Sequence, residues 1–217
     1  TKSAEDARRI MEIMHGPDDQ DATASRKEVD YAQSANGTGK FKIALVRDYV
    51  EHERVDPEIK ARFLAIEKKL IDDGHEVEWV DFPYTDYVVP NYYVLTTAEA
   101  SSNLSRYAGM LYGYRSDESQ DINSTIVKSR SEGFGEEVQR RIMLGTFVLS
   151  AGYYDAYYAK AQKVRRLVKD YNDNLLQKFD FIVSPMTPHP AFKFGANADP
   201  IAMYLEDIFC MQASLGG

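Results

Sequence analysis

The strand–helix–strand pattern in the first half of the chain constrains the fold more than any other feature. Residues 41–49 (FKIALVRDY) are an apolar run rich in strand-forming residues, and residues 75–82 (HEVEWVDF) alternate between apolar and polar side chains. Between them a helix is predicted from Pro57 to Gly74, because proline suits the first turn of a helix and glycine its end. Four regularly spaced apolar residues define its buried face: Ile59, Phe63, Ile66 and Leu70. The pattern predicts a βαβ unit in a largely parallel sheet.

The segment before this unit is predicted to be one helix followed by a polar loop. Ser3 can cap a helix that ends at Gly16, next to a proline. Residues 17–40 are rich in Asp, Ser, Gly and Asn and are predicted to form a surface excursion. The chain opens on a helix signal without a methionine and closes just after an apolar segment. Both ends are therefore expected to be cuts through a larger domain.

Residues 85–217 are predicted to be mainly helical, with one further strand. A helix is expected from about residue 90 to residue 106, with Pro90 either opening it or kinking it. Residues 180–185 (DFIVSP) predict the strand, and Pro200 is expected to open the last helix.

Residues 136–179 are predicted to be mostly helical. Gly145 and Gly152 within them are expected to allow either close packing or a break. Four tyrosines recur at helical spacing: Tyr153, Tyr154, Tyr157 and Tyr158. This pattern favours a packing stripe, and the wall of a ligand site is the alternative.

Composition excludes several classes of protein. The chain has 217 residues, 44% hydrophobic and 28% charged, which is enough for a buried core. Its net charge of −8 does not fit a basic nucleic-acid-binding module. The single cysteine, Cys210, excludes a disulfide framework and indicates a reducing compartment. No apolar run is long enough to span a membrane, and the N-terminal residues lack the apolar core of a signal peptide.

The obvious candidates for catalysis and metal binding are weak. Ser101 and Ser102 lie in a helical context without the glycine-rich turn that exposes a nucleophile, so a tight helix contact is the favoured interpretation. The sequence GFG at residues 133–135 is too short for a phosphate-binding loop. The four histidines lie at no metal-ligand spacing, and no metal site is expected: His15, His52, His75 and His189.

Residues 129–147 (SRSEGFGEEVQRRIMLGTF) contain the more informative pair, Arg140 and Arg141. Adjacent helical side chains project about 100° apart, so one arginine can face inward while the other stays in solvent. Arg141 is the one expected on the packed side, where a guanidinium needs a carboxylate. Asp207, taken as buried, is the candidate partner, with Glu206 as its solvent-facing neighbour. A structural ion pair and a clamp for a ligand both remain open at this point.

Four stretches closely resemble the A subunits of bacterial glutamyl-tRNA(Gln) amidotransferases, a family within the amidase signature enzymes: residues 98–115, 129–165, 179–192 and 198–209. The resemblance implies an α/β fold with a central mixed sheet flanked by helices. In that fold the chain forms an incomplete amidase domain, divided into three parts. They are a helix with its polar excursion (1–40), the βαβ unit (41–84), and a helical substrate-recognition part with one strand (85–217).

The resemblance also implies an activity. Members of this family hydrolyse glutamine, and the ammonia passes to a partner subunit that converts Glu-tRNA(Gln) into Gln-tRNA(Gln). The implied partners are glutamine, amidotransferase subunits B and C and, through the complex, tRNA. The resemblance implies no cofactor in this chain, because it places ATP and Mg on one of the partner subunits. It also implies a cytoplasmic protein with no membrane association.

The family's catalytic Ser–Ser–Lys triad is implied to lie outside this chain, because no stretch matches its glycine- and serine-rich loop or its lysine. The chain is therefore expected to hold no catalytic residue and to be inactive by itself. The resemblance assigns substrate binding to Arg141, Asp207 and Tyr92, with Arg140 and Tyr93 as alternatives in register. A guanidinium suits the α-carboxylate of glutamine, and a carboxylate suits its α-ammonium group.

Two other interpretations remain. A general amidase of the same superfamily would act on small amides, although an arginine–aspartate clamp favours an α-amino acid. A non-catalytic folded fragment would show no turnover.

Overall fold

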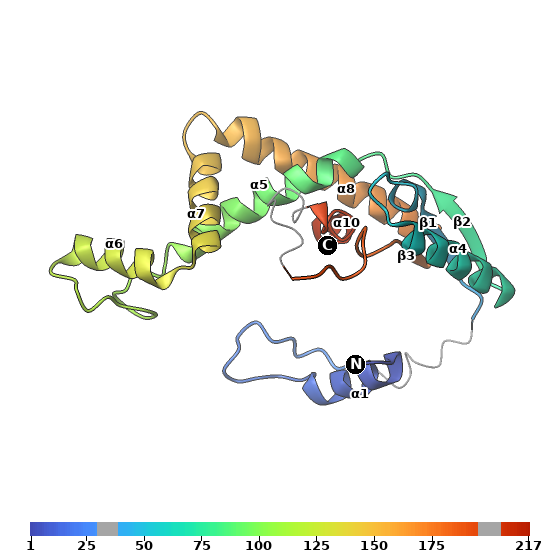
Figure 1. Ribbon diagram of the computed structural model, residues 1–217. Coiled ribbons are helices and arrows are strands. Elements are labelled where there is room, and N and C mark those ends of the chain that lie inside the picture. The colour runs from blue at the N-terminus through green and yellow to red at the C-terminus, as the bar shows by residue number, and fades with distance from the viewer. Residues whose placement is uncertain (30–38, 195–204) are drawn as a thin grey trace. The chain divides into compact units, whose positions relative to one another are not determined.

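The computed structural model describes residues 1–29, 39–194 and 205–217 (Figure 1). It divides into two compact units, Thr1–Lys40 and Phe41–Gly217. The predicted start of the last helix, Pro200, lies outside the described residues. No helix in the described ranges is long and apolar enough to cross a membrane.

The first unit contains helix α1 (Ala4–Met14). The Ser3 side chain accepts a hydrogen bond from the backbone N–H of Asp6 at 3.1 Å, which confirms the predicted cap. None of the α1 residues is buried, and Ile13 is 84% exposed. Residues 15–29 contain no helix or strand, as predicted for the polar excursion.

The second unit is built on a three-stranded sheet of β1 (Lys42–Val46), β2 (Glu76–Val80) and β3 (Phe181–Val183). The order is β2-β1-β3, and β1 pairs in parallel with both neighbours. Helix α4 (Pro57–Asp72) connects β1 to β2, so the predicted βαβ unit is confirmed. All three described strands are parallel, whereas the resemblance implied a mixed sheet.

Two details of the βαβ unit differ from the prediction. The first strand ends at Val46, because Arg47–Val50 form the short helix α3, whose turn places both Tyr49 and Val50 in the core. The predicted buried face of α4 is narrower than expected, since Phe63 is 5% exposed and Ile66 is 44% exposed. The apolar cluster that receives α4 contains only Ile43, Leu45, Val50 and Phe63 as fully buried residues.

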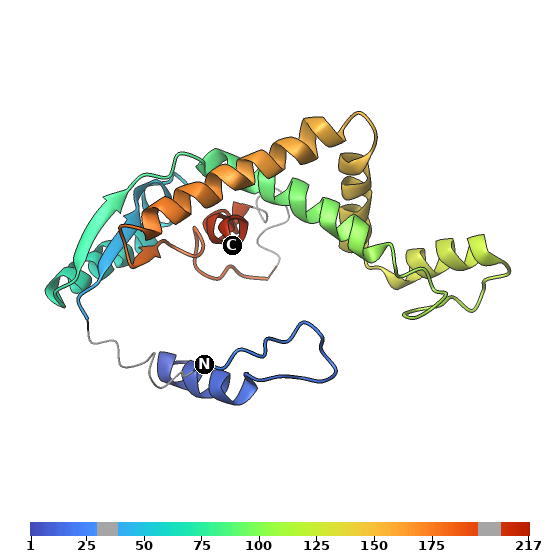
Figure 2. The same ribbon diagram turned by 180° about the vertical axis from the view of Figure 1, so that it is seen from behind.

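The long helices follow the sheet. They are α5 (Thr85–Leu104), α7 (Glu136–Leu149), the π-helix η1 (Tyr154–Ala159) and α8 (Lys160–Leu176). Helix α5 begins before Pro90, which lies inside it, so the predicted start at residue 90 was wrong. The predicted helical run of 136–179 breaks between α7 and η1, where Gly152 has a φ of +87°. The short helix α10 (Met211–Gly216) packs against α8 and α5 (Figure 2).

Helix α6 (Ile122–Gly133) was not predicted. Its signal is local: the Asp121 carboxylate accepts from the N–H of Ser124 at 2.7 Å, and the Ser124 hydroxyl accepts from the N–H of Asp121 at 2.9 Å. This reciprocal pair is a capping box, with serine in the place of the usual glutamate.

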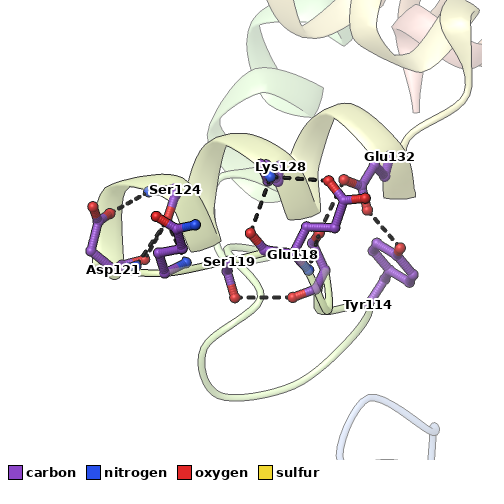
Figure 3. A network of polar contacts seen from close by, with 9 residues as sticks. Tyr114, Glu118, Ser119, Asp121, Ser124, Lys128 and Glu132 are labelled. Atoms are coloured by element: carbon purple, nitrogen blue, oxygen red, sulfur yellow. Dashed lines mark hydrogen bonds and ion pairs between the residues drawn. The ribbon is translucent and has the colours of Figure 1, made fainter.

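Polar side chains connect α6 to the loop before it (Figure 3). Glu132 accepts hydrogen bonds from the hydroxyls of Tyr114 (2.7 Å) and Ser116 (3.0 Å). The bond to Glu132 raises the pKa of Tyr114 because the carboxylate stabilises the protonated phenol. Lys128 forms an ion pair with Glu118 at 3.0 Å.

The main core lies where α5, α8 and the C-terminal segment meet the end of β1. Its fully buried members come from sequence positions far apart: Val46, Tyr49, Val55, Phe82, Val88, Leu95, Ala161, Val168, Ile208, Phe209, Met211 and Leu215. Burial of this apolar surface supplies the main stabilisation of the second unit.

Candidate functional site

The candidate site begins at the contact between α5 and α7. A Cβ atom added to Gly145 would lie 1.9 Å from the backbone oxygen of Thr97, so the two helix backbones touch at a position that only glycine allows. The hydroxyls of Ser101 and Thr146 lie 2.9 Å apart beside this contact. Ser101 therefore lies at a tight helix contact, which was the favoured interpretation.

Arg141 lies on the α7 face that meets α5. Its guanidinium carbon is 5.7 Å from the centre of the Tyr93 ring. Its Nε donates to the Glu137 carboxylate at 3.0 Å, one turn earlier in the same helix. The Arg141 side chain is 37% exposed and that of Arg140 is 54% exposed, in the order that the sequence predicted. Arg141 is therefore half-buried but open to solvent on one side.

The two tyrosines of α5 differ in their contacts. The rings of Tyr92 and Tyr93 meet edge to face at 5.4 Å, and both pack against the main core. Tyr93 is the residue that faces the guanidinium of Arg141. Of the two registers considered from the sequence, the geometry therefore brings Tyr93 to Arg141, with Tyr92 one contact further away.

Asp207 and Glu206 are placed opposite to the expectation. Asp207 is exposed, whereas the Glu206 side chain is only 17% exposed and lies 2.9 Å from His189 Nδ1. Within the described ranges, the ion pairs of Arg140 and Arg141 run to the acidic first turn of α7, and none runs to Asp207. The expected Arg141–Asp207 ion pair was therefore wrong. The reason is physical: an i,i+4 carboxylate is held next to Arg141 by the helix itself.

The backbone around Asp207 is fixed by its neighbours. Phe209 is buried, with its ring 4.8 Å from Tyr49 and 5.8 Å from His52. The backbone oxygen of Asp207 accepts from the N–H of Cys210 at 3.2 Å and from its thiol at 3.0 Å. Burial, together with the nearby Asp207 charge, raises the pKa of the Cys210 thiol. The exposed carboxylate thus stands on a well-anchored turn.

The tyrosine stripe is not part of the core. Tyr153, Tyr154 and Tyr157 are each 43–46% exposed, and rings of this stripe stack on one another and on Phe147. A cavity of about 460 Å³ is lined by Tyr154, Tyr158 and residues of α5 and α8, including Ser102 and Arg165. The predicted packing stripe was therefore wrong, because the π-helix turns these rings outward.

Glu137 is the site residue that the sequence reasoning missed. Its signal was available, because a glutamate four residues before an arginine on a helix is the favoured spacing for an ion pair. Among the described residues, no group of three or more His, Cys, Asp or Glu side chains is arranged to hold a metal ion.

Curated relatives match the whole chain. The A subunit of a glutamyl-tRNA(Gln) amidotransferase from Fusobacterium nucleatum is 50% identical over 218 residues, which are 100% of this chain and 45% of that protein. The protein of the same name from Koribacter versatilis is 48% identical, with the same two shares. The chain therefore spans about 45% of the length of these relatives.

Solved structures match in the same way. The crystal structure of the glutamyl-tRNA(Gln) amidotransferase A subunit from Thermotoga maritima superposes with a TM-score of 0.70 at 39% identity and covers 100% of this chain and 42% of that one. A bacterial aryl acylamidase of the amidase signature family matches with a TM-score of 0.64 at 20% identity, which speaks for the fold alone. The model of the amidase family matches residues 1–216, and the chain belongs to that family.

Proposed function

We propose that this chain supplies the substrate-recognition part of the glutamine-hydrolysing A subunit of a tRNA-dependent amidotransferase. In the complete protein, the released ammonia serves to convert Glu-tRNA(Gln) into Gln-tRNA(Gln). The relatives that match the full chain at 48–50% identity carry this name, which supports the proposal. Subunits B and C are the proposed partners, tRNA is bound through the complex, and the cytoplasm is the proposed location. ATP and Mg belong to a partner subunit in this proposal, and this chain holds no cofactor.

The observation that carries the proposal is the placement of Arg141. Its guanidinium is half-buried against Tyr93, yet one side remains open to solvent. A ligand carboxylate that displaces or shares the Glu137 contact gains two parallel hydrogen bonds from the fork of the guanidinium. Arg141 is thus proposed to bind the α-carboxylate of glutamine.

Asp207 is proposed to bind the α-ammonium group. Its carboxylate is exposed on an anchored turn and is therefore available to a cation. With both charged ends of the amino acid held, the side-chain amide is left free to reach the nucleophile. Tyr92 is proposed to line the same pocket, with Tyr93 beside the guanidinium.

The experiment is a kinetic comparison in the full-length protein, meaning a chain that contains these residues within a complete amidase domain and is assembled with its partner subunits. Arg141→Ala is expected to lower kcat/KM for glutamine by roughly 2–4 kcal/mol, the cost of a charge-assisted bidentate contact. Arg140→Ala is the matched control, because this side chain is the more exposed of the two.

Three outcomes of this comparison are informative. Parental kinetics in the Arg141 variant would refute the clamp. A loss confined to Arg140→Ala would move the role to the neighbouring arginine. A small aliphatic amide without charged groups, hydrolysed equally well by Arg141→Ala and the parent, would separate the clamp from general amidase chemistry. This chain by itself is predicted to release no ammonia from glutamine above background.

A further inference from the structure

Helix α10 is joined to α8 by a reciprocal pair of amides. The side-chain Nε2 of Gln212 donates to Oδ1 of Asn172 at 2.8 Å, and Nδ2 of Asn172 donates to the backbone oxygen of Gln212 at 3.3 Å. Gln212 is 5% exposed, so the neighbouring helix satisfies a buried polar side chain that would otherwise be costly to bury.

Gly216 makes room for this pair. A Cβ atom built on Gly216 would lie 2.4 Å from Nδ2 of Asn172, and an alanine there would push the amide away from Gln212. Arg165 of α8 adds a third link, since its Nε donates to the backbone oxygen of Leu215 at 3.2 Å. We call Asn172, Gln212 and Gly216 the amide latch.

The latch lies close to Asp207 along the chain. Helix α10 begins at Met211, directly after Cys210, whose N–H is bonded to the Asp207 oxygen. On the other side of Cys210, Phe209 is buried against Tyr49. The exposed Asp207 carboxylate is therefore located by two backbone anchors: the ring of Phe209 in the core and the attachment of α10 to α8.

We propose that Asn172 is a positioning residue for Asp207 and acts through the amide latch. It does not touch the substrate. It fixes α10, and α10 fixes the turn from which the Asp207 carboxylate meets the ammonium group of the amide donor. This inference rests on the proposed function, because it needs Asp207 to contact glutamine.

The test uses four single variants and one double variant of the full-length protein in its complex. Asn172→Ala and Gly216→Ala are each expected to raise KM for glutamine roughly tenfold, the factor that corresponds to losing one or two neutral hydrogen bonds. The value of kcat should change much less, because the acyl-transfer machinery is untouched. Asn174→Ala is the matched control, an exposed asparagine on the same helix. Asp207→Asn reports on the proposed function itself.

The double variant Asn172→Ala/Gly216→Ala gives the sharpest outcome. It should be no worse than Asn172→Ala alone, since the methyl group introduced at position 216 then meets no amide. Additive effects of the two changes on KM would overturn the latch. If Asp207→Asn raises KM and Asn172→Ala does not, the latch fails while the proposed function stands.

If Asp207→Asn leaves KM unchanged, the proposed role of Asp207 is wrong and this inference falls with it. Melting temperatures of all variants separate a kinetic effect from unfolding. A change in melting temperature with KM unaltered would show a purely structural contact and would also refute the proposal.

Discussion

Helices α5 and α7 are held together very differently from helix α6 and the loop before it. At the α5–α7 contact, Gly145 lets one backbone lie directly on another, and the contact leaves no space for a single added carbon. Helix α6 is attached instead by side-chain hydrogen bonds and an ion pair, and Val127 on it is 63% exposed. The first kind of contact is steric and hardly adjustable, whereas the second can be removed one bond at a time.

The largest effect is expected from Gly145→Ala. Its new Cβ would meet a backbone oxygen, which cannot rotate away, so the helices must separate. We expect a loss of about 3 kcal/mol in the free energy of unfolding of the full-length protein, at the upper end for overpacking. Denaturant unfolding and hydrogen exchange along α5 and α7 measure it.

Gly135→Ala is the control for this variant, because a Cβ there has nothing within 4 Å. It should cost less than about 1 kcal/mol, the range for a helix N-cap change. Equal losses in the two variants would show that the crossing is looser than described.

A smaller effect is expected from Arg130→Met, which tests how α6 is attached to α5. Arg130 Nη1 donates to the backbone oxygens of Leu104 at 2.7 Å and Tyr107 at 3.1 Å, and its guanidinium lies over Phe134 at 5.0 Å. Removing these bonds should cost about 1–3 kcal/mol locally. Hydrogen exchange should speed up in residues 107–133 and stay unchanged in α8. Faster exchange in both regions would show that the two regions unfold together.

The smallest effect is expected at the cap of α6 and depends on pH. The N–H of Ser124 lowers the pKa of Asp121 by donating to its carboxylate, so the folded pKa lies below the unfolded value of about 3.9. The cap therefore stabilises α6 above that value, and its contribution is lost as the pH falls through the folded pKa.

Asp121→Asn keeps an acceptor for the cap but removes the titration. Amide exchange in α6, compared between pH 5 and pH 3 after correction for the intrinsic rate, should show a pH-dependent loss in the parent and none in this variant. The same acid response in both proteins would assign it to other carboxylates.

The predictions made from the sequence succeeded where the signal was local and repeated. The βαβ unit, the Ser3 cap and the extent of α4 follow from periodicity, proline and glycine. They failed where polar side chains decide the structure. Helix α6 has only a weak apolar pattern, and its capping box uses a serine where glutamate is the usual signal. The tyrosine stripe failed because a π-helix changes the spacing that a 3.6-residue repeat assumes.

The candidate site shows the same division. Arg141 was placed on the packed face correctly, because neighbouring apolar residues mark that face along a helix. The burial of Asp207 and Glu206 was predicted the wrong way round, because a turn in the described structure replaces the helix that the sequence suggested. Whether Arg141, Asp207 and Tyr92 bind substrate stays a prediction for the kinetic experiments.

The sequence by itself determined the family, the parallel βαβ unit and the arginine on the packed face of α7. These depend on residue identity and on spacing within one element, which a sequence displays directly. Only the tertiary structure decided that Gly145 seals α7 onto α5, that Tyr93 faces the guanidinium and that Asn172 holds α10. Each of these contacts joins residues about 40 or more positions apart, and loop lengths and packing, not local spacing, bring them together.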